Sequence, residues 1–301
     1  MSALYSPRHF VKVASALLLL ATGARALADN TASGSGQGAS GGAFYSPLPK
    51  TVQEDIGDIR PASEAPISSY FHGQATLNGQ YTSNAPLYHS RDQADFLIAP
   101  TLEGGFTAPL NKNFTLDLEG RVEDFTYASD QSLGFWGVSG NANLEYRYKP
   151  AWPRIYVGVE PYYYLTYVTG NRLTSAVGPA AGIDQTVSIN RGKTLLFAGY
   201  HFGQYFSSPG SDTRQSHTAT ISLTQQLKRD LYAQLYWQLQ YSDYTVYGRD
   251  ETRDVVGASL IHQFNPHTFA SLFVNYVDNA SNNSLAKYET VNAGFSLVWQ
   301  Y

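Results

Sequence analysis

The sequence predicts an all-β protein, a transmembrane up-and-down antiparallel β-barrel of about 12 strands. Three observations lead to this fold class. Hydrophobicity alternates with a period of two from Tyr70 to the end of the chain, the alternating segments are long, and the connections between them alternate in length. No segment of comparable length has a helical period. The predicted strands cover residues 70–83, 92–107, 114–128, 133–149, 154–169, 179–190, 193–207, 213–227, 231–247, 252–264, 268–279 and 285–301.

The segment LYAQLYWQLQYS, residues 231–242, shows the alternation most clearly, with one fully apolar face and one polar or amphipathic face. A soluble β-sandwich would alternate in the same way but would turn its apolar face inward. Sandwich strands run about 5 to 6 residues, whereas a tilted strand needs about 9 to 11 residues to cross the hydrocarbon layer. Because the segments here are longer than sandwich strands, the pattern favours a membrane barrel, with lipid outside and a polar lumen inside.

The connections between the predicted strands alternate between tight turns and longer, more polar loops. The tight turns are LNKN, KPAWPR, NRGK, LKRD and NPH; the longer loops include SNAPLYHSRD, TGNRLTSAVGP, SSPGSD and NASNNS. This alternation is typical of an up-and-down barrel. A sheet in hydrocarbon must close, so its first and last strands pair, and an even strand count places both ends on the short-turn rim.

The first 69 residues do not show the strand pattern. Arg8 and Lys12 precede the apolar run of VKVASALLLLATG, and small residues at Ala26 and Ala28 precede the expected cleavage site, so residues 1–28 read as a signal peptide. Residues 29–69 form a flexible Gly/Ser- and Pro-rich segment, either a linker or a stretch that folds into a cavity. Residues 70–301 form the predicted barrel domain.

The composition excludes several classes of protein. The mean hydropathy of −0.28 argues against a bundle of membrane helices. A net charge of −4 gives no basic field, so nucleic acid is not an expected partner. The exported chain has no cysteine and cannot use disulfides, so its stability must come from packing and hydrogen bonds.

The final strand ends with the pattern F-x-L-x-W-x-Y, formed by Phe295, Leu297, Trp299 and Tyr301. Together with the signal peptide, the long strands and the alternating connections, it resembles a porin-like outer-membrane β-barrel protein of Gram-negative bacteria. The resemblance implies short periplasmic turns, longer extracellular loops, a surrounding of outer-membrane lipid, and recognition of this strand by the barrel-insertion machinery as an assembly signal. The family most often ends in Phe, and this chain has Tyr.

A barrel of about 12 strands can hold a narrow water-filled path, so the leading hypothesis is a channel for small polar or cationic solutes. Carboxylates outnumber guanidinium groups on the predicted inner face, which favours cations. Tyr156, Tyr162, Tyr164 and Gln240 could also line a path for sugars. The predicted lumen-lining residues are Glu103, Asp117, Glu119, Arg121, Glu123, Glu145, Arg147, Glu160, Asp184, Gln234 and Gln238.

Three alternatives stay open at this point. The lumen charges could pair with one another and plug a structural barrel. The protein could serve export or assembly at the outer membrane, with residues 29–69 binding a periplasmic partner or threading the lumen. A lipid hydrolase is disfavoured, because Ser216 and His217 fall on opposite faces of one strand. We expect no metal site and no cofactor, since the chain has no cysteine and no H-E-x-x-H motif.

Overall fold

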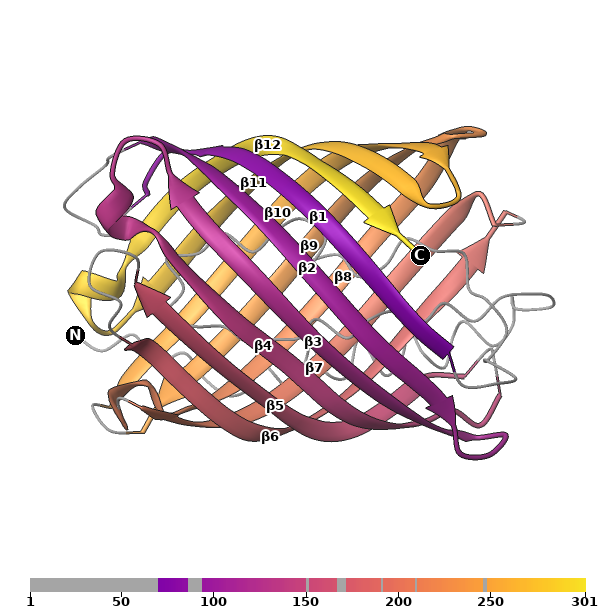
Figure 1. The fold of residues 1–301 in the computed structure, drawn as a ribbon, viewed down its shortest axis with the longest axis horizontal. Helices are drawn as coiled ribbons and strands as arrows, with labels where there is room; N and C mark the ends of the chain where they lie inside the picture. Colours follow the sequence, from indigo (N-terminus) through magenta and orange to yellow (C-terminus); the bar gives the residue numbers. More distant parts are fainter. Residues whose placement is uncertain are drawn as a thin grey trace.

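Twelve antiparallel strands form a closed barrel in which every strand pairs with its two neighbours in sequence and β1 pairs with β12 (Figure 1). The computed structural model describes residues 70–85, 94–149, 152–166, 172–190, 192–208, 210–245 and 248–301. The predicted signal peptide and the segment 29–69 lie outside the described residues. This closed barrel confirms the fold class predicted from the sequence.

The strands agree with the predicted segments to within a few residues, with one exception discussed below. Their bounds are β1 Tyr70–Thr82, β2 Asp95–Pro109, β3 Phe114–Tyr127, β4 Phe135–Tyr146, β5 Arg154–Thr166, β6 Arg172–Ile189, β7 Thr194–Ser208, β8 Arg214–Lys228, β9 Leu231–Tyr244, β10 Arg249–Asn265, β11 Thr268–Ser281 and β12 Tyr288–Gln300. Among the described residues, three single turns of 3-10 helix lie in the connections, at Gln131–Leu133, Gly210–Asp212 and Ser284–Ala286. In the part of the chain that the structure describes, no helix is long and apolar enough to cross a membrane.

The start of β6 corrects the sequence analysis. The stretch TGNRLTSAVGP was predicted to be a loop, with the next strand beginning at residue 179, but β6 begins at Arg172. Gly178 and Pro179 were taken as turn residues, and they lie inside the strand. In the ladder between β6 and β7, Val177 and Ala180 have partners, but Gly178 and Pro179 between them have none. Proline is tolerated at this position because no hydrogen bond from its nitrogen to β7 is required.

One connection on the loop rim is short, as the predicted strand bounds 231–247 and 252–264 imply. The connection between β9 and β10 runs only from Thr245 to Gly248, and these four residues fall within the range of two to seven residues found for the turns of the opposite rim. Gly248 has a φ of 57°, a conformation that glycine adopts without steric cost. The short turns are where the sequence analysis placed them, on the rim that also carries the start of β1 and the end of β12.

The barrel closes where the sequence analysis expected it to close. Residues Gln74 to Thr82 of β1 pair with Gln300 to Asn292 of β12, in the antiparallel sense. Phe295, Leu297, Trp299 and Tyr301 point outward, while Asn292, Ser296 and Gln300 are buried on the inner face. The seam is therefore built like any other strand pair of the wall.

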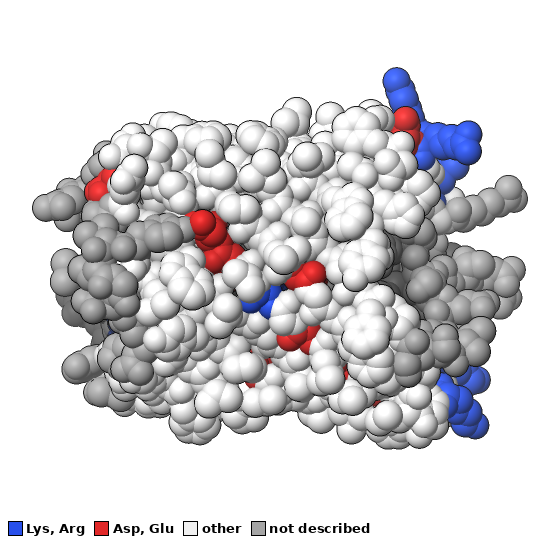
Figure 2. Space-filling model, in the orientation of Figure 1, with Lys and Arg blue, Asp and Glu red and all other residues white. Residues whose placement is uncertain are grey.

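The two faces of the wall are inverted relative to a soluble protein. Outward positions carry exposed apolar side chains, such as Leu102, Val157, Leu235, Leu272 and Leu297. Inward positions carry buried Gln, Asn, Ser, Thr, Glu, Asp and Arg side chains. Figure 2 shows an outer face made mostly of uncharged residues, with basic side chains projecting at one end. This arrangement fits a wall that faces lipid.

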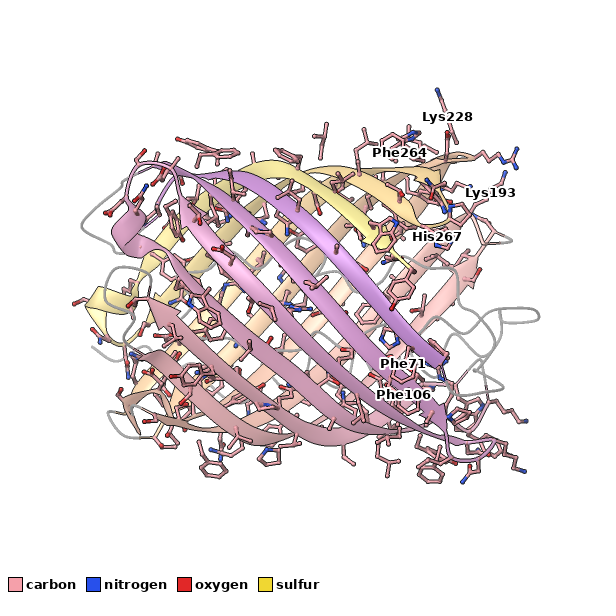
Figure 3. The ribbon with its side chains drawn as sticks, in the orientation of Figure 1. Phe71, Phe106, Lys193, Lys228, Phe264 and His267 are labelled. Atoms are coloured by element: carbon pink, nitrogen blue, oxygen red, sulfur yellow. The ribbon has the colours of Figure 1, made fainter. Side chains whose placement is uncertain are left out.

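The short-turn rim combines basic and aromatic side chains. Lys193 and Lys228 project from this rim, and Phe264, Phe71 and Phe106 lie close to it (Figure 3). Tyr148 and Trp152 flank another short turn with their rings 5.2 Å apart, and the Trp299 and Tyr301 rings stack at 5.7 Å. Tyr and Trp at this level suit a membrane interface, where the ring is in an apolar layer and its polar group reaches water.

Candidate functional site: the barrel lumen

Ten of the eleven predicted lumen residues lie at inward positions of their strands. Glu103, Glu123, Glu160, Asp184, Gln234 and Gln238 are buried on the inner face. Asp117, Glu119, Arg121 and Glu145 occupy the same inward phase of β3 and β4 and bond to other inward side chains. Arg147 follows β4 directly and lies in electrostatic range of Glu145 and Asp184.

A buried arginine joins three strands in the half of the lumen near the short turns. The Nη1 atom of Arg154 on β5 lies 2.6 Å from Oε1 of Glu145 on β4. Its Nη2 atom lies 2.7 Å from Oδ2 of Asp184 on β6, and Nε donates to the same carboxylate at 3.1 Å. The planar guanidinium suits such a shared contact, because its donors point in fixed directions toward two carboxylates.

A second ion pair joins β2 and β3, next to the strands that carry the Arg154 contacts. The Nη2 atom of Arg121 on β3 is 2.8 Å from Oε2 of Glu103, its direct cross-strand neighbour on β2. The sequence analysis placed both residues in the lumen but could not tell that they pair. Charge pairing of this kind supplies the partners that charged groups need on a low-dielectric wall.

Neutral polar side chains cover β8 and β9 on the opposite part of the wall. Gln240 donates to the Ser216 hydroxyl at 2.8 Å, and Ser216 and Ser242 are 3.2 Å apart. Gln238 donates to Thr220 at 3.4 Å. These cross-strand bonds hold amide and hydroxyl groups on the inner surface, so the inner face of the stretch from Ser216 to Thr224 on β8 and from Gln234 to Ser242 on β9 is polar without carrying formal charge.

A row of rings and guanidinium groups lies near the loop rim, and the sequence analysis had placed only Tyr162 and Tyr164 of this row in the lumen. We call it the aromatic–arginine arc, and it consists of Phe125, Phe135, Tyr164, Tyr162, Tyr205, Arg214, Tyr244 and Arg249. Adjacent ring centroids are 4.6 Å apart for Phe125 and Phe135, 5.8 Å for Phe135 and Tyr164, 6.1 Å for Tyr164 and Tyr162, and 6.0 Å for Tyr162 and Tyr205. The arc therefore crosses the inner wall from β3 toward β10.

Cation–π contacts continue the arc across β8, β9 and β10. Arg214 lies over the rings of Tyr205 and Tyr244 at 5.0 Å and 5.7 Å, and Arg249 lies 3.6 Å from the Tyr244 ring centroid. The strand register pairs Tyr205 with Arg214, Arg214 with Tyr244, and Tyr244 with Arg249. This pairing explains why tyrosine and arginine alternate along this part of the arc. One sequence signal was available: Phe125 and Tyr127 share the odd-numbered phase of Glu119 and Glu123 on β3.

The arc also fixes two of the predicted carboxylates. Tyr205 donates to Glu160 at 2.6 Å, and Tyr164 donates to Glu123. Tyr156, Tyr162 and Tyr164 all face inward, whereas Tyr163 is exposed on the outer face. Carboxylates, tyrosine rings and arginines therefore share one layer of the lumen, whereas the sequence analysis placed tyrosines and carboxylates there without the contacts between them.

The structure bears on the hydrolase alternative through the position of one Ser and one His. Ser216 is buried on the inner face, and His217 lies on the outer face against the rings of Tyr200, Phe202 and Tyr241. The His217 Nδ1 atom is 2.6 Å from the Tyr200 hydroxyl. The prediction that Ser216 and His217 cannot form a nucleophile and base pair on one face is confirmed by this geometry.

Comparison with solved structures places this barrel among outer-membrane proteins by fold. An outer-membrane channel from Pseudomonas putida F1 matches with a TM-score of 0.52 and 14% identity, over 79% of this chain and 97% of that chain. The chain has the fold of an outer-membrane β-barrel. No protein-family model matches, and a search of curated protein sequences found no match.

Two further structures match with lower scores. The translocator domain of the autotransporter NalP from Neisseria meningitidis has a TM-score of 0.43 and 12% identity, over 79% of this chain and 90% of that chain. The NanC porin has a TM-score of 0.45 and 11% identity, over 75% of this chain and 98% of that chain.

Proposed function

We propose that this protein is a narrow channel of the Gram-negative outer membrane, and that it passes small polar solutes with a modest preference for cations. The observation that supports the proposal is the inverted wall, with apolar side chains outside and ionisable or amide side chains at the inward positions. A barrel of about 12 strands lies between the small barrels filled by side chains and the wide porins.

The charge distribution on the inner face supports a weak selectivity. The predicted carboxylates exceed the predicted arginines, which favours cations. Arg214 and Arg249 of the aromatic–arginine arc add positive charge that the sequence analysis did not count. Ion pairing of Glu103, Glu145 and Asp184 with arginines further reduces the local excess.

The setting of the channel is part of the proposal. Residues 1–28 would direct export, β12 with Phe295, Leu297, Trp299 and Tyr301 would present the assembly signal to the barrel-insertion machinery, and the short turns would face the periplasm. The apolar outer face would contact outer-membrane lipid.

The ion pairs of Glu103, Glu145 and Asp184 with arginines also favour a competing function, a structural barrel whose paired charges leave no conducting path.

A conductance measurement distinguishes a channel from a barrel that has no conducting path. We expect the purified mature chain to give discrete steps in a planar lipid bilayer, with a reversal potential in a salt gradient that indicates cation preference. Folded protein would first be identified by its anomalous migration on a denaturing gel before boiling. A correctly folded barrel that inserts and passes no current would contradict the proposal.

Two adjacent residues of β7 provide a matched pair of variants. Tyr205 is fully buried on the inner face, and Phe206 is 59% exposed on the outer face. Tyr205→Ala removes a ring from the aromatic–arginine arc on the lumen side, so the conductance should rise. Phe206→Ala removes a ring of similar size from the lipid side and should leave the conductance unchanged, which controls for general loosening of the wall.

A further inference from the structure

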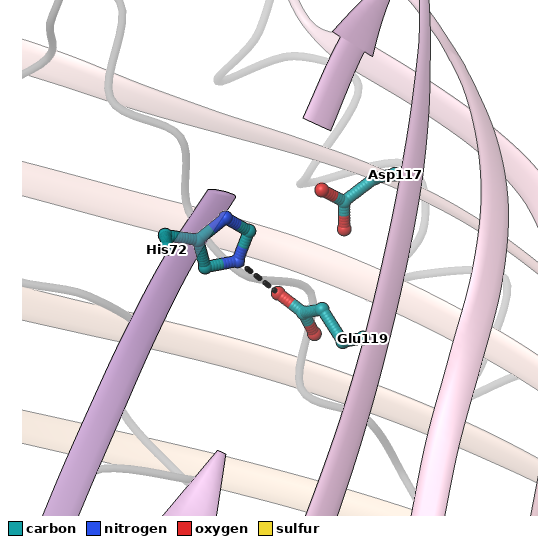
Figure 4. A group of neighbouring side chains, drawn as sticks. All are labelled: His72, Asp117 and Glu119. Atoms are coloured by element: carbon teal, nitrogen blue, oxygen red, sulfur yellow. Dashed lines mark ion pairs between the residues drawn. The ribbon is translucent and has the colours of Figure 1, made fainter. Parts of the chain in front are cut away.

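His72, Asp117 and Glu119 converge on the inner wall near the short-turn rim (Figure 4). One ligand atom from each of these residues lies within 4.8 Å of the other two. The Nε2 atom of His72 is 3.7 Å from Oε1 of Glu119. The three side chains come from β1 and β3, which are not neighbours in the sheet.

The strand between them makes the approach possible because it carries a glycine. His72 is the register partner of Gly105 on β2, and Gly105 is the partner of Glu119 on β3. A Cβ atom at residue 105 would lie 2.3 Å from Nε2 of His72, so the imidazole occupies the space that a side chain would need. The absence of a side chain therefore lets His72 reach across β2 to the carboxylates of β3.

Neighbouring donors hold the two carboxylates in place. Asn141 donates to Oε2 of Glu119 at 2.6 Å, and Thr107 donates to Oδ1 of Asp117 at 2.7 Å. Such second-layer bonds fix the orientation of groups that bind a metal ion. The Nδ1 atom of His72 is buried and has no hydrogen-bond partner among the described residues. No hydrogen bond at Nδ1 therefore accounts for the orientation of the imidazole ring.

We propose that His72, Asp117 and Glu119 form a binding site for one divalent transition-metal ion of the Zn²⁺ class. An imidazole nitrogen with carboxylate oxygens suits a metal of intermediate softness, and three protein ligands leave a position for water. The two carboxylates carry two formal negative charges, which match one divalent cation. The nearby Arg121 lies against Glu103 at 2.8 Å.

The proposed site departs from the sequence analysis, which expected no metal site because the chain has no cysteine and no H-E-x-x-H motif. Metal ligands on different strands of a barrel need not be close in sequence, so motif spacing cannot reveal them. The proposal does not depend on conduction. A barrel that binds the ion and passes no current would contradict the proposed channel and leave the metal site intact.

The same lumen contains a matched control for the histidine. The Nε2 atom of His201 lies 3.5 Å from Oε2 of Glu160, a distance close to that of the His72 and Glu119 pair. Among the residues that the structure describes, only the His72 group has three ligand-type side chains together. A simple pairing of histidine with a carboxylate would make the two sites behave alike, whereas a metal site requires the third ligand.

Titration calorimetry with Zn²⁺ on the folded, untagged mature chain in detergent tests the proposal. We expect one ion per chain, a loss of affinity of at least about tenfold for His72→Ala and for Asp117→Asn, and no change for His201→Ala. Each variant would first be checked for the folded gel migration. Absence of binding by the unaltered protein, or equal loss for His72→Ala and His201→Ala, would overturn the assignment.

Bound Co²⁺ gives a second readout that a fold defect would not imitate. Its visible absorption changes when imidazole and carboxylate replace water around the ion, so the unaltered protein should show a new band and His72→Ala should not. Gly105→Ala should weaken the band as well, because the added methyl displaces the imidazole. A band that survives both substitutions would place the ion elsewhere and contradict the proposal.

Discussion

Gln300 donates a hydrogen bond from Nε2 to Oε1 of Gln74 at 2.6 Å, and this bond joins the last strand to the first on the inner face of the barrel. The backbones of the same two strands pair from Gln74 to Thr82. Beyond this stretch, the backbone amide of Tyr301 donates to the carbonyl of Gly73 at 3.1 Å, and the amide of Gly73 donates to the carbonyl of Tyr301 at 3.2 Å. The seam thus continues past the end of β12 to Tyr301.

Deleting Tyr301 should impair insertion of the barrel. The deletion removes both backbone bonds to Gly73 and the ring that covers Gly73 at the short-turn rim. We expect a lower fraction of heat-shifted protein in the outer membrane, measured on unboiled gels. Tyr301→Phe retains the ring and the backbone, so it should insert normally. Unchanged surface levels of the deleted protein would argue against a role in assembly.

Leu272→Arg should destabilise the barrel because Leu272, the fifth of the 14 residues of β11, lies inside the strand and is 64% exposed on the outer face. A cation facing the middle of the hydrocarbon layer costs about 2 to 4 kcal/mol, falling to about 0 to 1 kcal/mol near the interface. Leu227→Arg provides the matched control, since Leu227 is outward and lies beside Lys228 at the end of β8. Urea unfolding in lipid vesicles would measure both; equal costs would contradict a membrane-facing wall.

Neutralising either member of the Glu103 and Arg121 pair should shift ion selectivity in opposite directions. Glu103→Gln removes a negative charge from the lumen and should move the reversal potential toward anions. Arg121→Gln removes the positive partner and should move it toward cations. The double variant restores the balance of charge and should resemble the unaltered protein. Shifts of the same sign in both single variants would show that these side chains do not face the permeant ions.

Zinc binding should weaken as the solution is acidified from about pH 7.5 to about pH 5.5, because a metal ion requires neutral imidazole and ionised carboxylates. The groups around the site are His72, Asp117, Glu119, Glu103 and Arg121, and protons compete with the ion at the first three. Calorimetry across this range measures the effect. An affinity that stays constant over the range would argue against imidazole as a ligand.

The strand pattern was readable from sequence wherever alternation was uninterrupted. The segment LYAQLYWQLQYS became β9 with its apolar positions outward, and FSLVWQY became the seam strand with its aromatic residues outward. The prediction was wrong at the start of β6, where Gly178 and Pro179 resemble turn residues. Proline fits within this strand because of how β6 pairs with β7, and pairing depends on residues far along the chain.

The sequence by itself determined which side chains share a face, because side chains alternate across a strand whatever its partners are. It thus placed Glu103, Arg121 and Asp184 inward together. Only the tertiary structure decided which of them meet, since closure and register set the neighbours across strands. The Arg154 contacts with Glu145 and Asp184, the aromatic–arginine arc and the approach of His72 to Glu119 over Gly105 all depend on that register.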